Sequence, residues 1–147
     1  IIPYTSSHQP WFEKFNRAWI EKYFWMEPID IDVLTKPEEH IIGPGGKIWM
    51  ALYNEVPAGT VALKKVNAFT VEFTKMAVDE QYQGLKIGRA LAEAALADAK
   101  AHGVTQVILY SHSSLKTALA LYEKLGFKYM PVDGLYKRSD VKMELTL

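Results

Sequence analysis

The chain has 147 residues, of which 49% are hydrophobic, and its 17 basic residues balance its 17 acidic ones. This length and composition predict one globular domain spanning residues 1–147, and the balanced charge gives no reason to expect nucleic acid or a membrane surface as a partner. The absence of cysteine excludes disulfides, thiolate metal sites and a cysteine nucleophile, and it is compatible with the reducing, cytoplasmic location that we expect.

The N-terminal third of the chain predicts two helices and no secretory signal or membrane span. Apolar residues recur at helical spacing from residue 9 to residue 24, which indicates an amphipathic helix. Pro28 ends this helix at the latest. Residues 32–40 predict a second, short helix before the glycine-rich loop 43–47.

The middle of the chain predicts three strands and a helix. Residues 47–54 and 60–66 indicate an antiparallel hairpin with its turn at residues 55–59, and residues 71–79 indicate a further strand. An alanine-rich helix follows and stops at Gly103.

The C-terminal part predicts a strand, a helix and a final hairpin. Residues 104–111 carry apolar side chains on both faces, the pattern of a strand covered on both sides. Residues 115–125 form a helix ended by Gly126, and the last two strands flank a polar turn at residues 133–140. The expected fold is therefore α+β in three layers, with a mostly antiparallel, mixed sheet flanked by about four helices.

Gly84 and Gly88 stand immediately before the alanine-rich helix. The first-turn N–H groups of a helix lack partners within it, and the helix dipole places positive charge there, so this position can hold a phosphate. The alternative is that the two glycines only allow the helix to pack closely on a strand. Neither GxGxxG nor GxxxxGK[ST] is present, which excludes the common nucleotide-binding loops.

Two motifs carry a family resemblance. Residues 83–88 read Gln-Gly-Leu-Lys-Ile-Gly, and residues 122–127 read Tyr-Glu-Lys-Leu-Gly-Phe. With the order of strands and helices from about Lys47 onward, these motifs resemble the GNAT superfamily of N-acetyltransferases, whose members move an acetyl group from acetyl-coenzyme A to an amine. The resemblance implies the acyl-CoA N-acyltransferase fold.

Two positions depart from the family pattern. Lys86 stands where the family motif has its first glycine, so either the backbone there is right-handed or the loop is slightly altered. The Lys86 ammonium could also help to neutralise phosphate. Leu115 stands where many members carry an asparagine, which leaves Ser113 or Ser114 as substitutes.

The resemblance implies a coenzyme site on the loop and on the strand before it. The main-chain N–H groups of residues 84–89 would bind the diphosphate, and Met76 and Val78 would pair with the pantetheine arm. The Met76 N–H would stabilise the oxyanion formed on the thioester carbonyl. The expected coenzyme-binding residues are Met76, Ala77, Val78, Gln83, Gly84, Leu85, Lys86, Ile87, Gly88, Arg89, Ser114 and Lys124.

Tyr122 is the expected general acid. It shares a helical face with Leu115 and Leu119, so its ring should be buried and its hydroxyl should need a partner. The resemblance implies that it protonates the departing thiolate, and an ordinary phenol pKa of ~10 suits that task. The alternative is a core tyrosine whose hydroxyl donates to a backbone carbonyl.

Glu72 is the expected general base. It lies six residues before Val78, where histone-acetylating relatives keep a glutamate that removes the proton of the amine through water. The period of a strand places Glu72 on the same face as Thr74 and Met76. The alternative is an exposed strand carboxylate with no catalytic role.

The histidines and serines indicate no metal site and no hydrolase. His8, His40, His102 and His112 lack a ligand spacing, and only His112 is expected near the coenzyme. The serines within residues 111–114 are expected to cap the next helix.

The acceptor pocket is expected between the first two helices and the loop that joins the last two strands. Residues 13–40 contain seven acids against four bases, which favours a cationic amine, whereas Lys137 and Arg138 could hold a carboxylate. An amino acid would satisfy both. The aromatic residues of the first helix region either line this pocket or pack in the core or a homodimer interface; they are Trp11, Trp19, Tyr23 and Trp25.

The sequence thus predicts an acetyl-coenzyme A-dependent N-acetyltransferase that acts on a small-molecule amine by direct attack in a ternary complex. No covalent enzyme intermediate is expected, because neither a cysteine nor an activated serine is present. Two alternatives remain open: a non-catalytic coenzyme A-binding or interaction domain on the same scaffold, and an acyltransferase that acts on protein lysines or with longer acyl chains.

Overall fold

The computed structural model describes residues 1–147 as a mixed sheet with helices on both faces. The strands are β1 (Ile2–Pro3), β2 (Lys47–Tyr53), β3 (Val56–Lys65), β4 (Thr70–Val78), β5 (Gln106–Ser111), β6 (Lys128–Met130) and β7 (Val141–Thr146). The helices are α1 (Gln9–Tyr23), α2 (Pro28–Thr35), α3 (Ile87–Ala101) and α4 (Lys116–Lys124). Short helical turns lie at Ser6–His8, Glu38–Ile42 and Glu80–Tyr82. None of the helices is long and apolar enough to cross a membrane.

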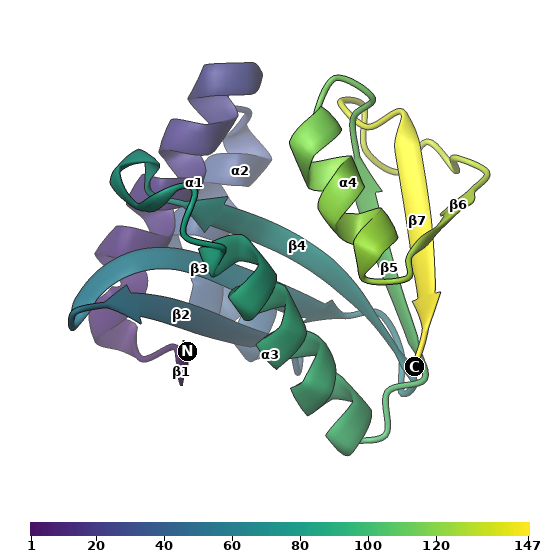
Figure 1. The fold of residues 1–147 in the computed structure, drawn as a ribbon, viewed down its shortest axis with the longest axis horizontal. Coiled ribbons are helices and arrows are strands. Elements are labelled where there is room, and N and C mark those ends of the chain that lie inside the picture. Colours follow the sequence, from purple (N-terminus) through teal and green to yellow (C-terminus); the bar gives the residue numbers. More distant parts are fainter.

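The seven strands follow the order β1-β2-β3-β4-β5-β7-β6, and only the β4–β5 pair is parallel. Helices α1 and α2 cover one face of the sheet, and α3 and α4 cover the other (Figure 1). The expected three layers and the mostly antiparallel sheet are therefore confirmed.

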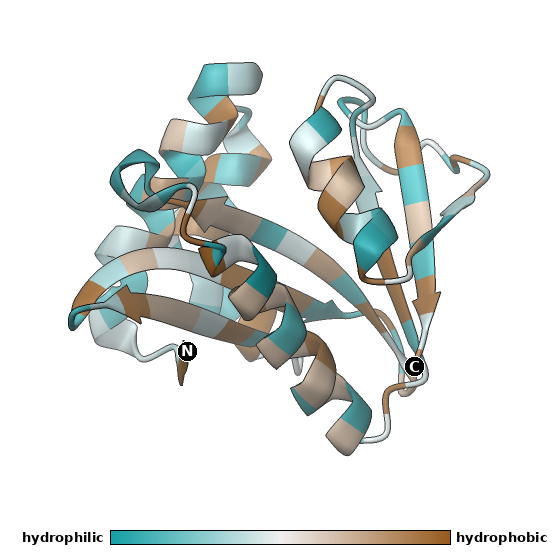
Figure 2. Cartoon of the chain, in the orientation of Figure 1, coloured by the Kyte–Doolittle hydropathy of each residue, from teal (hydrophilic) through white to brown (hydrophobic).

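The hydrophobic core is divided by the sheet. The larger cluster lies between the sheet and α3 and α4, and a smaller one joins α1, α2 and the opposite face. Figure 2 shows α3 alternating between hydrophobic and hydrophilic segments along its length, as an amphipathic helix does. Its buried side consists mainly of alanines with Leu91 and Leu96, and such small side chains let the helix backbone approach the sheet closely.

Strand β5 differs from the expected pattern of a strand covered on both sides. Val107, Leu109 and Ser111 are buried, whereas Ile108 and Tyr110 are only half-buried. Tyr110, on this half-covered face, lines a cavity.

The first hairpin turns earlier than expected. Tyr53 pairs with Val56, so the turn consists of Asn54 and Glu55 alone, both at positive φ. Strand β3 then runs through the proline and glycine that had indicated a turn. A two-residue turn with positive φ at both positions matches the twist of the flanking strands, and asparagine favours such a conformation.

The second helix is also displaced from its expected position at residues 32–40. Helix α2 begins at Pro28, because proline suits the first turn of a helix, where its missing N–H is not needed. The Glu27 N–H donates to Asp30 Oδ2 at 2.9 Å and closes the start of the helix. Asp30 is thereby fixed in the first turn of α2.

A bulge in β4 changes which side chains share a face. Ala62 pairs with Thr74 and Thr60 with Ala77, so Lys75 and Met76 together oppose a single residue of β3. Lys75 adopts a φ of 55°, in the left-handed region. The expectation that Glu72 and Met76 share a face is therefore wrong: Met76 packs toward α3, and Glu72 lies on the side of α1 and α2.

Strands β4 and β5 part just before the bulge. Their pairing ends at Phe73 and Leu109, although β4 continues to Val78 and β5 to Ser111 (Figure 1). The expected opening beside Met76 is thus present. On this side the backbone of β4 from Thr74 onward has no neighbouring strand.

Candidate active site

The loop before α3 presents a row of free amides. None of the six N–H groups from Gly84 to Arg89 donates a hydrogen bond to another group of the protein; the first donor after them is Ala90, whose N–H bonds to the Lys86 carbonyl. The amides therefore remain available to an anion at the positive end of the α3 dipole.

The backbone of this loop requires two positive φ angles. Gly84 has a φ of 85° and Lys86 a φ of 61°. Of the two alternatives for Lys86, the right-handed backbone is wrong, and a left-handed conformation costs an L-residue about 1–2 kcal/mol.

The two glycines are not explained by close packing. A Cβ added to Gly84 would meet no atom within 4 Å, and one added to Gly88 would meet only Met76 and Val78, at 3.9 Å. The packing alternative for these glycines is therefore wrong. The same contacts place the start of α3 directly beside the Met76 side chain.

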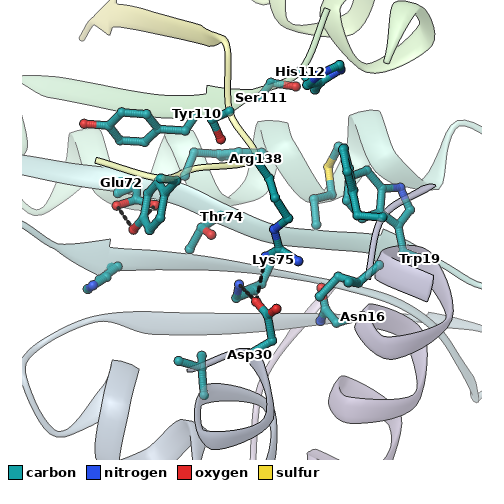
Figure 3. A pocket seen from close by; sticks show the side chains of 18 of the residues that line it. Asn16, Trp19, Asp30, Glu72, Thr74, Lys75, Tyr110, Ser111, His112 and Arg138 are labelled. Atoms are coloured by element: carbon teal, nitrogen blue, oxygen red, sulfur yellow. Dashed lines mark hydrogen bonds and ion pairs between the residues drawn. The ribbon is translucent and has the colours of Figure 1, made fainter. Parts of the chain in front are cut away.

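A cavity of about 300 Å³ opens where β4 and β5 part (Figure 3). Helices α1 and α2, the end of β5 and the loop between β6 and β7 supply the remaining walls, as expected for an acceptor pocket. The cavity brings together residues of three separate elements: Glu72 and Met76 of β4, Ser111 and His112 at the end of β5, and Tyr122 of α4.

Tyr122 borders this cavity from α4. Its ring packs edge-on against Phe73 and Phe127, with centroids 5.8 and 6.0 Å away, and the residue is only 9% exposed. The hydroxyl makes no hydrogen bond within the protein and is not a fully buried unsatisfied atom, so the alternative of a core tyrosine bonded to a carbonyl is wrong. Burial raises the pKa of Tyr122 to about 12, so the ordinary phenol pKa expected from the sequence does not hold. The hydroxyl is fully protonated at neutral pH.

Glu72 is buried rather than exposed, with 4% of its surface accessible. The Tyr136 hydroxyl, from the loop between β6 and β7, donates to both carboxylate oxygens, at 3.0 and 3.1 Å. Burial raises the pKa of Glu72, while the Tyr136 hydrogen bond and the charge of Lys64 oppose that rise. A buried carboxylate with a raised pKa suits proton abstraction better than an exposed one does.

A charged cluster crosses the cavity from α2 to the last loop (Figure 3). Arg138 donates to the Trp25 carbonyl at 2.7 Å and to Asp30 Oδ1 at 2.8 Å. Lys75 Nζ lies 4.0 Å from the same Asp30 oxygen. Arg138 therefore ties the last loop to the start of α2 and is already committed to protein acceptors.

Three of the expected residues, Ser113, Ser114 and Lys124, do not line the cavity. Lys124 is exposed and does not line the cavity. Ser113 bonds to Asp140 and Ser114 to His112, so both are engaged with protein groups. Neither serine caps α4, which begins after Leu115 without a side-chain cap.

The aromatic residues of the first helix region divide between the cavity and the surface. Trp19 lines the cavity, whereas Trp11, Tyr23 and Trp25 do not. Trp25 is 62% exposed.

Three cavity residues, Asp30, Lys75 and Tyr136, were not predicted from the sequence. Lys75 reaches the cavity only because of the bulge, and a lysine is not a residue that marks a bulge. Asp30 and Tyr136 lie in segments that showed no motif. His40 also lines the cavity, although only His112 was expected there.

Known proteins resemble this chain in sequence and in fold. A family model described as "Acetyltransferase (GNAT) family" matches residues 5–127. The human protein named N-acetylaspartate synthetase is 30% identical over 124 residues, which are 84% of this chain and 39% of that protein. The chain thus spans well under half the length of this relative.

Two solved structures share the fold. A GNAT acetyltransferase from Staphylococcus aureus superposes with a TM-score of 0.87 at 21% identity, over 99% of this chain and 97% of that one. The paia N-acetyltransferase from Thermoplasma acidophilum, solved in complex with coenzyme A, superposes with a TM-score of 0.74 at 21% identity, over 96% and 94% of the two chains. With the family match over most of its length, the chain belongs to the GNAT family of acetyltransferases.

Proposed function

We propose that this chain catalyses the transfer of an acetyl group from acetyl-coenzyme A to the primary amine of a small molecule. The observation that carries the proposal is that the free amides of residues 84–89 lie next to the opening between β4 and β5. An anion bound at the amides would lie at one end of that opening, and the cavity lies along it.

The residues present suit the family's co-substrate. Acetyl-coenzyme A would supply the acetyl thioester. The amides of residues 84–89 would hold its diphosphate, since they offer several donors and a favourable helix dipole. Lys86 would add one positive charge. The unpaired edge of β4 at Met76 and Val78 would hydrogen-bond the pantetheine arm, as an added strand would.

Two side chains would move protons on opposite faces of the sheet. Glu72 would take a proton from the acceptor amine, directly or through water, because it is a buried carboxylate held in place by Tyr136. Tyr122 would give a proton to the departing thiolate, because its hydroxyl borders the cavity without an internal partner. The Met76 N–H would stabilise negative charge on the carbonyl oxygen.

A direct attack in a ternary complex fits these groups. The chain contains no cysteine, and the serines that line the cavity, Ser111 and Ser139, make no side-chain hydrogen bond to a base. Ser114 contacts His112 Nδ1 but does not line the cavity. The human relative's name, N-acetylaspartate synthetase, supports an amino acid as one acceptor to test.

The proposal is tested by measuring thiol release from acetyl-coenzyme A with a panel of primary amines, alongside calorimetric titration with coenzyme A. Turnover that depends on an amine is expected. Coenzyme A binding without turnover for any acceptor would instead support the non-catalytic alternative. Propionyl- and butyryl-coenzyme A, and lysine-containing peptides, distinguish the longer-chain and protein-lysine alternatives.

A further inference from the structure

Lys75 enters the cavity because of the β4 bulge. In a regular strand, Lys75 would point away from Thr74 and toward α3. The bulge and the φ of 55° instead direct its side chain toward α2, where the ammonium approaches Asp30 and the side chain is 21% exposed (Figure 3). A strained backbone at a non-glycine residue in a cavity is a feature that often accompanies function.

The Lys75 ammonium has no hydrogen-bond partner within the protein. No carboxylate oxygen lies closer to it than Asp30 Oδ1, which is 4.0 Å away and beyond hydrogen-bonding distance. Asp30 already accepts from Arg138 through Oδ1 and from the Glu27 N–H through Oδ2. One carboxylate thus faces two cations, and the three N–H donors of the ammonium are left for another group.

The other acids of the cavity do not hydrogen-bond the ammonium. Both oxygens of Glu72 accept from Tyr136, and Glu27 forms no ion pair. The basic residues that line the cavity are Lys64, Lys75, Lys137 and Arg138, and the acidic ones are Glu27, Asp30 and Glu72. Burial lowers the pKa of Lys75 and the charges of Asp30 and Glu72 oppose that shift, so an anionic ligand group beside the ammonium would stabilise its charged form.

We propose that the acceptor carries a carboxylate near its amine, as an amino acid does, and that the Lys75 ammonium binds this carboxylate. The inference rests on the proposed acetyl transfer and specifies its substrate class. Glu72 and Lys75 line the cavity from the same strand, because the bulge turns Lys75 toward the side on which Glu72 lies. An amino acid in the cavity would turn its amine toward Glu72 and its carboxylate toward Lys75.

Arg138 and Lys137 were the residues expected from the sequence to hold a carboxylate. Arg138 already donates to Asp30 and to the Trp25 carbonyl, and Lys137 is exposed. Lys75 is the cavity cation that combines burial with free donors. Arg138 would position it indirectly by fixing the shared Asp30.

The test compares two substitutions at Lys75 that keep the same backbone strain, because both introduce an L-residue with an unbranched side chain. Lys75→Met removes the charge, and Lys75→Arg retains it. Lys14→Met, on the exposed side of α1, is the matched control for loss of a lysine. Each protein is assayed by thiol release with the common L-amino acids and their carboxamides, and by calorimetric titration with succinate, which has carboxylates but no amine.

The wild type and Lys14→Met should use the best amino acid with a kcat/KM at least about tenfold above that of its carboxamide, which is the magnitude of one charge-assisted hydrogen bond. Lys75→Met should lose this preference and its affinity for succinate, and Lys75→Arg should retain most of both. If Lys75→Arg fails as completely as Lys75→Met, the lysine does not act through its charge and the inference is wrong.

The inference and the proposed function fail separately. Turnover that favours amines without a carboxylate and is insensitive to Lys75→Met would overturn the inference and leave acetyl transfer intact. Succinate binding that requires Lys75, without turnover of any amine, would support the anion site and contradict the proposed function. If neither succinate binding nor amine turnover is observed, the inference and the proposed function are both wrong.

Discussion

Replacing Tyr122 with phenylalanine separates catalysis from stability, because the hydroxyl has no role in holding the fold. The ring is fixed by edge-on contacts with Phe73 and Phe127, and these contacts survive the substitution. A lost internal hydrogen bond would cost about 0.5–1.5 kcal/mol, but the Tyr122 hydroxyl makes none. The free energy of unfolding of Tyr122→Phe should therefore stay within about 0.5 kcal/mol of the wild type.

The catalytic effect of the same substitution should be large. Loss of a general acid lowers the rate by about 10²–10⁴-fold, or about 2.7–5.5 kcal/mol of transition-state free energy. Since burial raises the pKa of Tyr122 to about 12, its hydroxyl stays protonated across the usual assay range. The wild type should accordingly show no loss of turnover near pH 10 that depends on Tyr122.

The assay combines three measurements on purified protein: thiol release at saturating acetyl-coenzyme A, calorimetric affinity for coenzyme A, and urea unfolding. Tyr129→Phe is the control, because Tyr129 is exposed on β6 and its hydroxyl donates to Glu123 outside the cavity. Turnover of Tyr122→Phe within about threefold of the wild type would refute a general acid at this position. Destabilisation above about 1.5 kcal/mol would show instead that the hydroxyl is structural.

Three further substitutions test the coenzyme loop and the buried acid. Gly88→Val should weaken coenzyme A binding by crowding the amides, and unchanged affinity in calorimetry would contradict the placement of the diphosphate. Lys86→Gly should raise the free energy of unfolding by about 0.5–1 kcal/mol in urea titrations, because relief of the left-handed strain exceeds the entropy that glycine adds to the unfolded chain. Glu72→Gln should be more stabilising at pH 8 than at pH 4. Because the pKa of Glu72 is raised in the folded protein, the wild type loses stability as pH rises from 4.5 through that pKa. The glutamine variant has no such group and should not lose stability in this way. Equal effects at the two pH values would exclude a raised pKa.

The fold could be predicted from the sequence wherever the local rules agreed. The helical stripe of α4, ended by Gly126 with Phe127 packed behind it, was confirmed because periodicity and a C-terminal stop agree there. The first hairpin was displaced because two rules competed. Pro57 and Gly59 are turn residues in isolation, but the positive φ angles at Asn54 and Glu55 close a shorter turn that leaves both in β3.

The parts of the site that depend on local backbone could be predicted from the sequence. The parts that depend on contacts between distant segments could not. The free amides before α3 follow from any helix start, so the loop could be located from residues 83–88. Glu72 was placed on the wrong side relative to Met76 because strict alternation ignores bulges. The Tyr136 contact with Glu72 spans 64 residues, and no local pattern specifies such a pair.

The two strained lysines raise the same physical question. Lys75 and Lys86 have φ angles of 55° and 61°, which glycine adopts without steric cost. At both positions glycine would therefore satisfy the backbone at lower conformational energy, so the benefit of lysine lies in its ammonium. Lys86 lies in the loop that carries the free amides, and Lys75 lines the cavity. The left-handed backbone at Lys86 and Lys75 therefore accompanies two positive charges near the opening. The charge of Lys86 suits a phosphate, and that of Lys75 suits a carboxylate.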